Sequence, residues 1–253
     1  MAIVIKTPKE IESLRIAGKH LSEVLTVVER AVTPGVTTND LDNIARETIL
    51  ALGDVPAFLG YTPEGAAYPY PAALCVSVND EVVHGIPTDR ILKEGDIVSI
   101  DCGLSHNGLF VDSARTVACG KISKKDSELL HRTQEALALG IAAAIGGNKV
   151  GDIGYAVEQY IKPFKYGIIR ELAGHGVGKK IHEDPYIPNF GKKNTGELLR
   201  PGMVIAIEPM INIGSRHIVF DNDGYTIRTE DGSRSAHFEH TVLITEGEPE
   251  ILT

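Results

Sequence analysis

The sequence predicts an α+β fold of two pseudo-symmetric halves, each with two helices followed by strands, around a central antiparallel sheet. Two observations predict it. The order helix, helix, strands occurs twice along the 253 residues, and residues 92–101 (LKEGDIVSID) align without a gap to residues 199–208 (LRPGMVIAIE). A looser similarity joins PGVTTNDLDNIA to GGNKVGDIGYAV. Such internal similarity is typical of a duplicated unit, and the alternative is a coincidence between two short strands that follow a glycine. A pseudo-twofold pairing would place Asp101 and Glu208 at equivalent positions.

The first half begins with two predicted helices. Thr7 suits an N-cap, Pro8 suits the first helical position, and Glu10 follows three residues after the cap. Apolar residues then recur on one face at helical spacing, namely Leu14, Ala17, Leu21, Val24 and Val28. Residues 37–53 (TTNDLDNIARETILALG) repeat this pattern and end at Gly53.

The second half repeats the order. We expect a third helix from Ser123 to the glycines at 146–147, and a fourth in GDIGYAVEQYIKPF that Pro163 ends. Strand-rich segments follow each helix pair. They cover residues 72–86, 96–104 and 108–119 in the first half and residues 203–213, 224–231 and 237–247 in the second.

Composition narrows the class of protein. With 43% hydrophobic and 23% charged residues, residues 1–253 have the makeup of a single globular domain. A formal charge of -9 argues against binding nucleic acid through a broad basic surface. No apolar run reaches membrane-spanning length, and the N-terminus lacks the layout of a secretory signal. The three cysteines, Cys75, Cys102 and Cys119, suggest free thiols in a reducing compartment, so we expect a cytoplasmic protein.

Two aspartates flank an Asn-Gly turn at residues 107–108. In a two-residue hairpin loop, Gly103 would pair with Asp112, and Asp101 would share that face, so the two carboxylates would converge. Two carboxylates at such a short distance repel each other, and this repulsion raises the pKa of one of them unless a cation lies between them. The alternative is a solvated hairpin face with unrelated aspartates. The largely apolar neighbours leave little exposed surface, so we favour a metal site.

Other residues add to this hypothesis. Glu208 ends an apolar strand, Glu239 is expected in the middle of a strand, and both charges would be costly without a partner. His175 lies in a glycine-rich stretch, His182 follows seven residues later, and His84 ends a strand. Four carboxylates and one imidazole are enough for a site that holds two metal ions.

With these residues, the chain resembles the type I methionine aminopeptidases, which have the pita-bread metallopeptidase fold. The similarity covers about residues 4–252. It is carried in order by VSVNDEVVHGIP, GDIVSIDCG, VDSART, GHGVGKKIHEDP, MVIAIEPM and SAHFEHTVLIT. Prolidases and X-Pro aminopeptidases share the fold but usually carry an extra N-terminal domain. The type II enzymes carry a helical insertion that is not visible here.

The resemblance implies five metal ligands. Asp101 would bind one ion, Asp112 and Glu239 would bridge two ions, and His175 and Glu208 would complete the other. It implies that His84 and His182 face the substrate. As a mechanism, we expect Glu208 to act as general base, His182 to stabilise the oxyanion with a metal ion, and His84 to lie near the scissile nitrogen.

The resemblance also implies a methionine pocket, partners and a cofactor. The pocket would be built from Phe58, Tyr61, Tyr70, Cys75, Ile181 and Tyr225. Plain hydrophobic core is an equal alternative for Phe58 and Ile181. The substrates would be N-termini of nascent polypeptides with a small second residue. We expect a monomer that binds neither membrane nor nucleic acid, and ribosome association stays open. The cofactor would be two divalent ions, and Co, Mn, Fe, Zn and Ni all suit these ligands.

Two other classes of function compete. One is a catalytically inactive scaffold that binds partners, but all five ligands are present. The other is a two-metal phosphoesterase, which would need basic residues to hold the phosphate. Lys179 and Lys180 are the only nearby candidates in the sequence.

Overall fold

The computed structural model describes residues 3–63 and 65–253. The helices are α1 (Pro8–Ala31), α2 (Thr38–Ala51), α3 (Lys124–Ala143), α4 (Val150–Ile161) and the 3₁₀ helix η1 (Lys162–Phe164). The strands up to α3 are β1 (Val55–Pro56), β2 (Leu74–Val78), β3 (Glu81–Val83), β4 (Ile97–His106) and β5 (Leu109–Ala118). The strands after η1 are β6 (Gly167–Ile168), β7 (Gly174–Gly176), β8 (Glu183–Ile187), β9 (Val204–Ile207), β10 (Met210–Asn212), β11 (Ile218–Phe220), β12 (Ile227–Thr229), β13 (Ser235–His237), β14 (His240–Leu243) and β15 (Glu250–Ile251).

The four predicted α-helices are confirmed. α1 begins after Thr7, whose side chain and that of Glu10 form the expected capping box, and its apolar face is buried. α3 has Ser123 as N-cap but ends at Ala143, three residues before the predicted glycines. In the described part of the chain, no helix combines the length and the apolarity that crossing a membrane requires.

The structure confirms the internal duplication. β4 and β9 begin at aligned positions, and the aligned glycines before them, Gly95 and Gly202, have φ of +91° and +88°. A left-handed turn of this kind favours glycine, which explains why both halves keep one there. The starts of the second helices also correspond, because isolated bridges join Thr37 to Ile91 and Lys149 to Leu198. Equivalent turns thus enter equivalent strands in the two halves.

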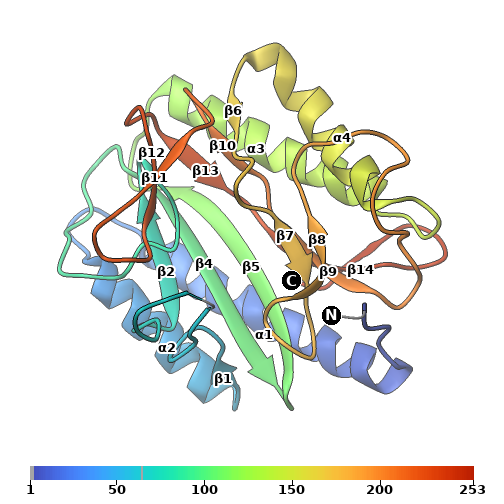
Figure 1. Ribbon diagram of the computed structural model, residues 1–253. Coiled ribbons are helices and arrows are strands. Elements are labelled where there is room, and N and C mark those ends of the chain that lie inside the picture. Colours follow the sequence, from blue (N-terminus) through green and yellow to red (C-terminus); the bar gives the residue numbers. More distant parts are fainter. Residues whose placement is uncertain (1–2, 64) are drawn as a thin grey trace.

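Within the described residues, the strands pair antiparallel in four sheets. β4 and β5 form the longest ladder, and β2 lies on the other side of β4. In the second half the order is β15-β14-β9-β7-β8. A bridge between Ala114 of β5 and Glu239 connects the halves, so the long hairpin runs beside the strands of the second half (Figure 1).

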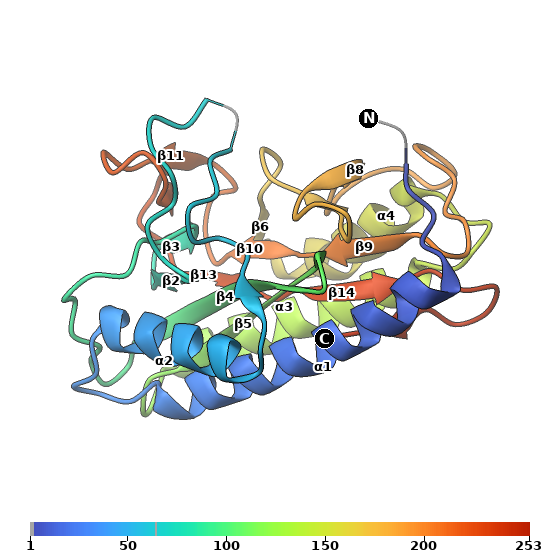
Figure 2. The ribbon, with the colours of Figure 1, turned by 90° about the horizontal axis from the view of Figure 1, so that it is seen from below.

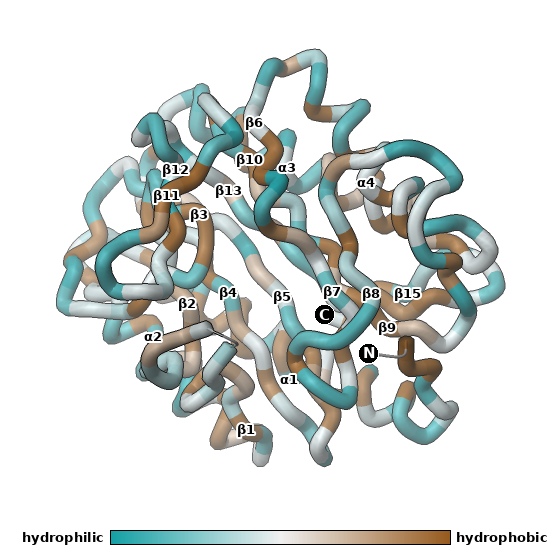
Figure 3. The backbone as a smooth tube through the Cα atoms, in the orientation of Figure 1, coloured by the Kyte–Doolittle hydropathy of each residue, from teal (hydrophilic) through white to brown (hydrophobic). Residues whose placement is uncertain are grey.

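The helices and the loops lie on different sides of the strands. Figure 2 shows α1 and α2 below the strand layer, and the segments around β8 and β11 above it. Each half has its own hydrophobic core. One contains the inner faces of α1 and α2 with β2, β4 and β5, and the other contains α3, α4, β9 and β10. Hydrophobic stretches gather in these strands, while the peripheral loops are mostly hydrophilic (Figure 3).

Two expectations need correction. Glu239 is not in the middle of a strand: it lies between β13 and β14, in the bridge to Ala114. Several short strands were not predicted, namely β1, β6, β7, β8, β11 and β15. They have two to five residues, which is too short for a period-2 pattern to stand out from sequence.

Candidate functional site

The hairpin of β4 and β5 brings two carboxylates together as predicted. Gly103 pairs with Asp112 and Asp101 pairs with Ala114, so both aspartates lie on one face. The amide of Glu239 donates to the Ala114 carbonyl at 2.9 Å, and this contact brings the glutamate to the same face. Asp101, Asp112 and Glu239 each present an oxygen, and these oxygens lie within 4.8 Å of one another.

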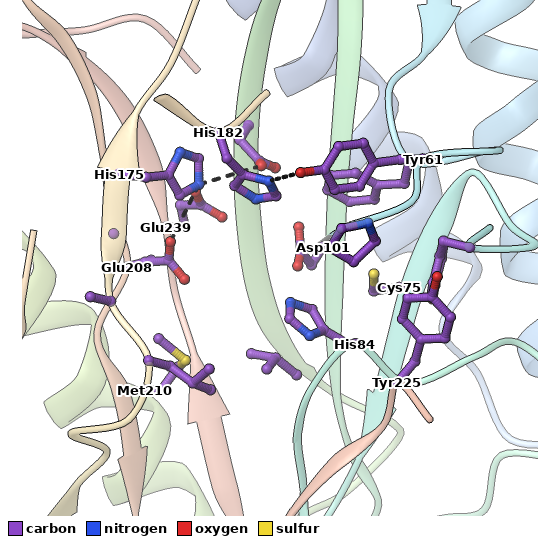
Figure 4. A pocket seen from close by; sticks show the side chains of 18 of the residues that line it. Tyr61, Cys75, His84, Asp101, His175, His182, Glu208, Met210, Tyr225 and Glu239 are labelled. Atoms are coloured by element: carbon purple, nitrogen blue, oxygen red, sulfur yellow. Dashed lines mark hydrogen bonds and ion pairs between the residues drawn. The ribbon is translucent and has the colours of Figure 1, made fainter. Parts of the chain in front are cut away.

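The second half contributes Glu208 and His175. Glu208 follows directly after β9, and His175 lies in β7. The Nε2 atom of His175 lies 3.5 Å from Glu208 Oε1 and 3.9 Å from Asp112 Oδ2. The glycines on either side of His175 allow this approach, because a Cβ at Gly174 or Gly176 would overlap a neighbouring carbonyl. Figure 4 shows the Asp101, Glu208 and Glu239 carboxylates directed toward a shared space between the halves.

Burial changes the proton affinity of these groups. Loss of hydration raises the pKa of Asp101 to about 7 and that of Glu208 to about 8. Burial and then repulsion from neighbouring carboxylates raise the pKa of Asp112 and Glu239 well above the usual range. Burial lowers the pKa of His175 to about 3, so this imidazole is neutral. Negative charge is therefore costly in this cluster unless a cation is close.

The unsatisfied atoms show that the cluster fits metal ions. Among the described residues, none provides a hydrogen bond to Asp101 Oδ1, Asp112 Oδ1 or Glu239 Oε1. Buried oxygens usually have a partner, and a divalent cation would supply one for all three. Carboxylate oxygens with one imidazole nitrogen form a donor set that suits several divalent metals.

Two further histidines lie at the cavity. His84 follows β3 with φ of +60°, and burial lowers its pKa to about 4. His182 stacks edge-on against His175 at a centroid distance of 4.4 Å, and its Nδ1 lies 3.0 Å from the Tyr61 hydroxyl (Figure 4). Burial lowers the pKa of His182 as well, so both rings are neutral near pH 7.

A cavity of about 230 Å³ lies beside the carboxylates. Five of the six predicted pocket residues line it: Phe58, Tyr61, Tyr70, Cys75 and Tyr225. The sixth, Ile181, packs in the same hydrophobic cluster but does not line the cavity. Sequence reasoning missed other lining residues that come from distant segments, namely Pro63, Val83, Leu172, Ala173, Gly174, Tyr186 and Met210.

Sequence reasoning also missed His237. Its Nε2 lies 3.6 Å from Glu208 Oε2 and 4.0 Å from Glu239 Oε2, and the ring is buried. Neither ring nitrogen has a hydrogen-bond partner among the described residues. The signal that could have found it is its position two residues before Glu239, which places both side chains on one side of an extended chain.

With this geometry, the class of the protein is clear: the chain belongs to metallopeptidase family M24, whose model matches residues 12–246. It is 50% identical to the methionine aminopeptidase of Aquifex aeolicus, over 100% of this chain and 99% of the relative. It is 44% identical to that of Clostridium acetobutylicum, over 99% of this chain and 98% of the relative.

Solved structures agree. The methionine aminopeptidase of Thermotoga maritima matches with a TM-score of 0.96 at 44% identity, over 100% of this chain and 99% of that one. The prolidase of Pyrococcus furiosus matches with a TM-score of 0.78 at 26% identity, but this chain covers only 65% of it. The predicted fold class, the resemblance to methionine aminopeptidases and the metallopeptidase class are therefore confirmed.

Proposed function

We propose that this protein is a metal-dependent aminopeptidase that removes an N-terminal methionine from polypeptides whose second residue is small. The observation that carries the proposal is that one cavity has the carboxylate and imidazole cluster on one side and aromatic rings with a thiol on the other. A thioether side chain packs well against aromatic rings and sulfur. The full-length similarity to methionine aminopeptidases supports the same substrate.

Five residues would hold two divalent ions in this proposal: Asp101, Asp112, His175, Glu208 and Glu239. Asp112 and Glu239 are the candidates to bridge, because each belongs to the group that includes Asp101 and also to a group that includes His175. Ions bound there would polarise the peptide carbonyl and lower the pKa of a water molecule.

Glu208 is the proposed general base. Burial raises the pKa of its carboxyl to about 8 without metal, whereas bound cations would favour the deprotonated form, which is the form that accepts a proton. Its Oε1 is 3.5 Å from His175, and its other oxygen faces His237.

His182 is the proposed donor to the developing oxyanion. When the Tyr61 hydroxyl donates to Nδ1 of this neutral ring, the proton of the imidazole is on Nε2. An N–H group held in this way can stabilise negative charge on the substrate carbonyl oxygen without reorganising. Tyr61 would therefore fix the tautomer of His182 as well as line the pocket.

His84 and the cavity wall would position the substrate. His84 lines the cavity with Cys75 and Tyr225, and we assign it to the scissile nitrogen. The Tyr70 hydroxyl donates to the Gly85 carbonyl at 2.9 Å, which fixes this ring against the segment that carries His84.

The proposal includes the oligomeric state, the cellular compartment and the natural substrate. We infer a monomer of one domain that works in the cytoplasm on nascent chains. Three buried cysteines without a disulfide among the described residues support a reducing compartment. A phosphoesterase is less well supported, because Lys179 forms an ion pair with Glu10.

A peptide series tests the proposal. With divalent metal, Met-Ala-Ser, Met-Gly-Ser and Met-Ser-Ser should release free methionine, whereas Met-Leu-Ser and Met-Lys-Ser should react poorly. A side chain that displaces the carbonyl by about 1 Å can cost on the order of 100-fold in rate. Ala-Ala-Ser is the control for the methionine pocket. Equal rates for Met-Ala-Ser and Met-Leu-Ser, or for Met-Ala-Ser and Ala-Ala-Ser, would contradict the proposed specificity.

A further inference from the structure

A second cluster of metal-binding side chains lies outside the cavity. His20 comes from α1, Asp54 follows the end of α2, and His106 is the last residue of β4. Each offers an atom that lies within 4.8 Å of the other two. None of the three lines the cavity described above, so the proposed peptidase function leaves them without a role.

The imidazoles of His20 and His106 both lie within hydrogen-bond distance of the Asp54 carboxylate. His20 Nδ1 lies 2.7 Å from Asp54 Oδ2, and His106 Nδ1 lies 2.6 Å from Asp54 Oδ1. The rings are perpendicular, with centroids 5.4 Å apart. Two imidazole nitrogens, from elements far apart in sequence, therefore meet at the two oxygens of one carboxylate.

The charge of Asp54 is the reason to look for a cation. Its side chain is 0% exposed, and a buried carboxylate without a countercharge is costly. Within residues 3–63 and 65–253, the ion-pair partners found for Asp54 are these two imidazoles. A metal ion bound between the three side chains would supply a fixed positive charge beside this buried carboxylate.

We propose that His20, Asp54 and His106 form a third metal site, for a divalent transition ion that prefers imidazole, with Zn²⁺ as the probe. Two histidines and one carboxylate are a common ligand set for such ions. Bonds of about 2.0–2.2 Å require ligand atoms roughly 3.0–3.4 Å apart, so the rings must move outward by several tenths of an ångström. Their side chains are 23% and 19% exposed, which leaves room for this movement and for water at the remaining positions.

Asn107 supports the required change of tautomer. Its Nδ2 lies 3.0 Å from His106 Nε2, and when this amide donates to Nε2 the ring nitrogen that faces Asp54, Nδ1, carries the proton. When Nδ1 binds an ion, the ring proton moves to Nε2, and the Asn107 amide can rotate to accept it through its oxygen. The same neighbour therefore serves both states of the ring.

Metal stoichiometry tests the proposal. The holoenzyme is titrated with Zn²⁺ in a calorimeter, and bound zinc per chain is measured after dialysis. We expect three ions on the wild-type chain and two on His20→Gln and on His106→Gln, with methionine release from Met-Ala-Ser unchanged. The matched control is His217→Gln, which removes an exposed histidine elsewhere and should keep three ions.

A second measurement, of zinc binding and thermal stability, tests the third site if the single histidine variants fold poorly. Asp112→Asn with Glu239→Gln removes ligands of the proposed peptidase site, and this variant should still bind one Zn²⁺ and gain thermal stability from it. Adding His106→Gln should remove that gain. Two ions on the wild-type chain, a third ion retained in both single histidine variants, or an equal loss in His217→Gln would overturn the third site. None of these outcomes depends on peptidase activity.

Discussion

Asp112 and Glu239 are 3% and 2% exposed, and each has a carboxylate oxygen that no described residue satisfies. At the scale of single residues, this combination is the strongest physical sign of a cation site. Burial alone raises a carboxylate pKa, but a protein rarely gathers several such groups without a compensating charge. His237 extends the same argument, because it is a buried imidazole with two unsatisfied nitrogens beside Glu208.

The proposed bridging role of Asp112 and Glu239 can be tested directly. Asp112→Asn or Glu239→Gln should abolish activity and reduce bound metal, because each change removes a negative charge where two cations would repel. Metal analysis and circular dichroism would check both effects, and we expect the fold to be kept. Full metal occupancy with normal turnover in either variant would contradict the ligand assignment.

Substitutions of His182 and Tyr61 should both lower kcat, but by different amounts. His182→Ala should lower kcat by roughly 10²–10³-fold, with little change in KM and with metals retained, because an oxyanion donor acts in the transition state. Tyr61→Phe should lower kcat less, since the ring stays but its tautomer is no longer fixed. Loss of metal from His182→Ala would instead make His182 a ligand.

His237 is expected to position Glu208. His237→Ala should weaken metal binding by about 10–100-fold, the usual loss when a partner of a metal ligand is removed. His237→Gln should keep most of the affinity, because its amide can donate a hydrogen bond toward Glu208. His240→Gln is the control, since His240 contacts Thr253 instead. Equal affinity in wild type and His237→Ala, measured by calorimetry, would count against this role.

At the scale of elements, the second helices of the two halves begin with one shared capping hydrogen bond and differ in another. Thr37 caps α2 and accepts from the Asp40 amide at 3.1 Å, while Asp40 accepts from the Thr37 amide at 2.9 Å. Lys149 occupies the equivalent position before α4, and its amide donates to Asp152 at 2.8 Å. The aspartate of the capping box is therefore kept in both halves, and the side-chain cap is present only in the first.

This difference gives a stability prediction. Thr37→Ala should lower the free energy of unfolding by about 1 kcal/mol, because the amide of Asp40 loses its acceptor. Thr33→Ala, in the loop before α2, should change it by less than about 0.5 kcal/mol. Urea unfolding of both variants would decide, and equal stabilities would mean that the cap contributes little.

At the scale of the whole molecule, the site lies between the two halves of the chain. Asp101 and Asp112 come from the hairpin of the first half, and His175 and Glu208 come from the second. Ions bound between them would tie the halves together. We therefore expect one cooperative unfolding transition whose midpoint rises with metal concentration.

The pH dependence of the metal-free protein follows from the raised carboxylate pKa values. Asp101 and Glu208 have folded pKa values of about 7 and about 8, above their ordinary values of 3.8 and 4.5. The folded state therefore binds more protons than the unfolded state. This contribution to stability is fully present below the ordinary values and is lost as pH rises through about 7 and 8.

In a chelating buffer, the free energy of unfolding should fall between about pH 5 and about pH 8. Asp101→Asn should flatten this dependence, and saturating metal should reverse it, since metal binds the deprotonated ligands. Urea unfolding at several pH values measures it. A metal-free protein that gains stability over this interval would contradict the assigned directions.

The sequence by itself determined the repeated order of elements, the helix starts and the carboxylate hairpin. These depend on local signals: Thr7 and Ser123 as caps, glycine at the left-handed turns, and an Asn-Gly loop that fixes the register of β4 and β5. The five expected ligands also came from sequence, through position in strands and through resemblance.

Only the tertiary structure decided which distant side chains meet. His237 approaches Glu208, and His20 and His106 approach Asp54, although nothing in the local sequence pairs them. The short strands of the second half and the place of Glu239 between two of them also needed the fold. The physical reason is that local propensities act over a few residues, whereas these contacts arise when the two halves and their helices pack.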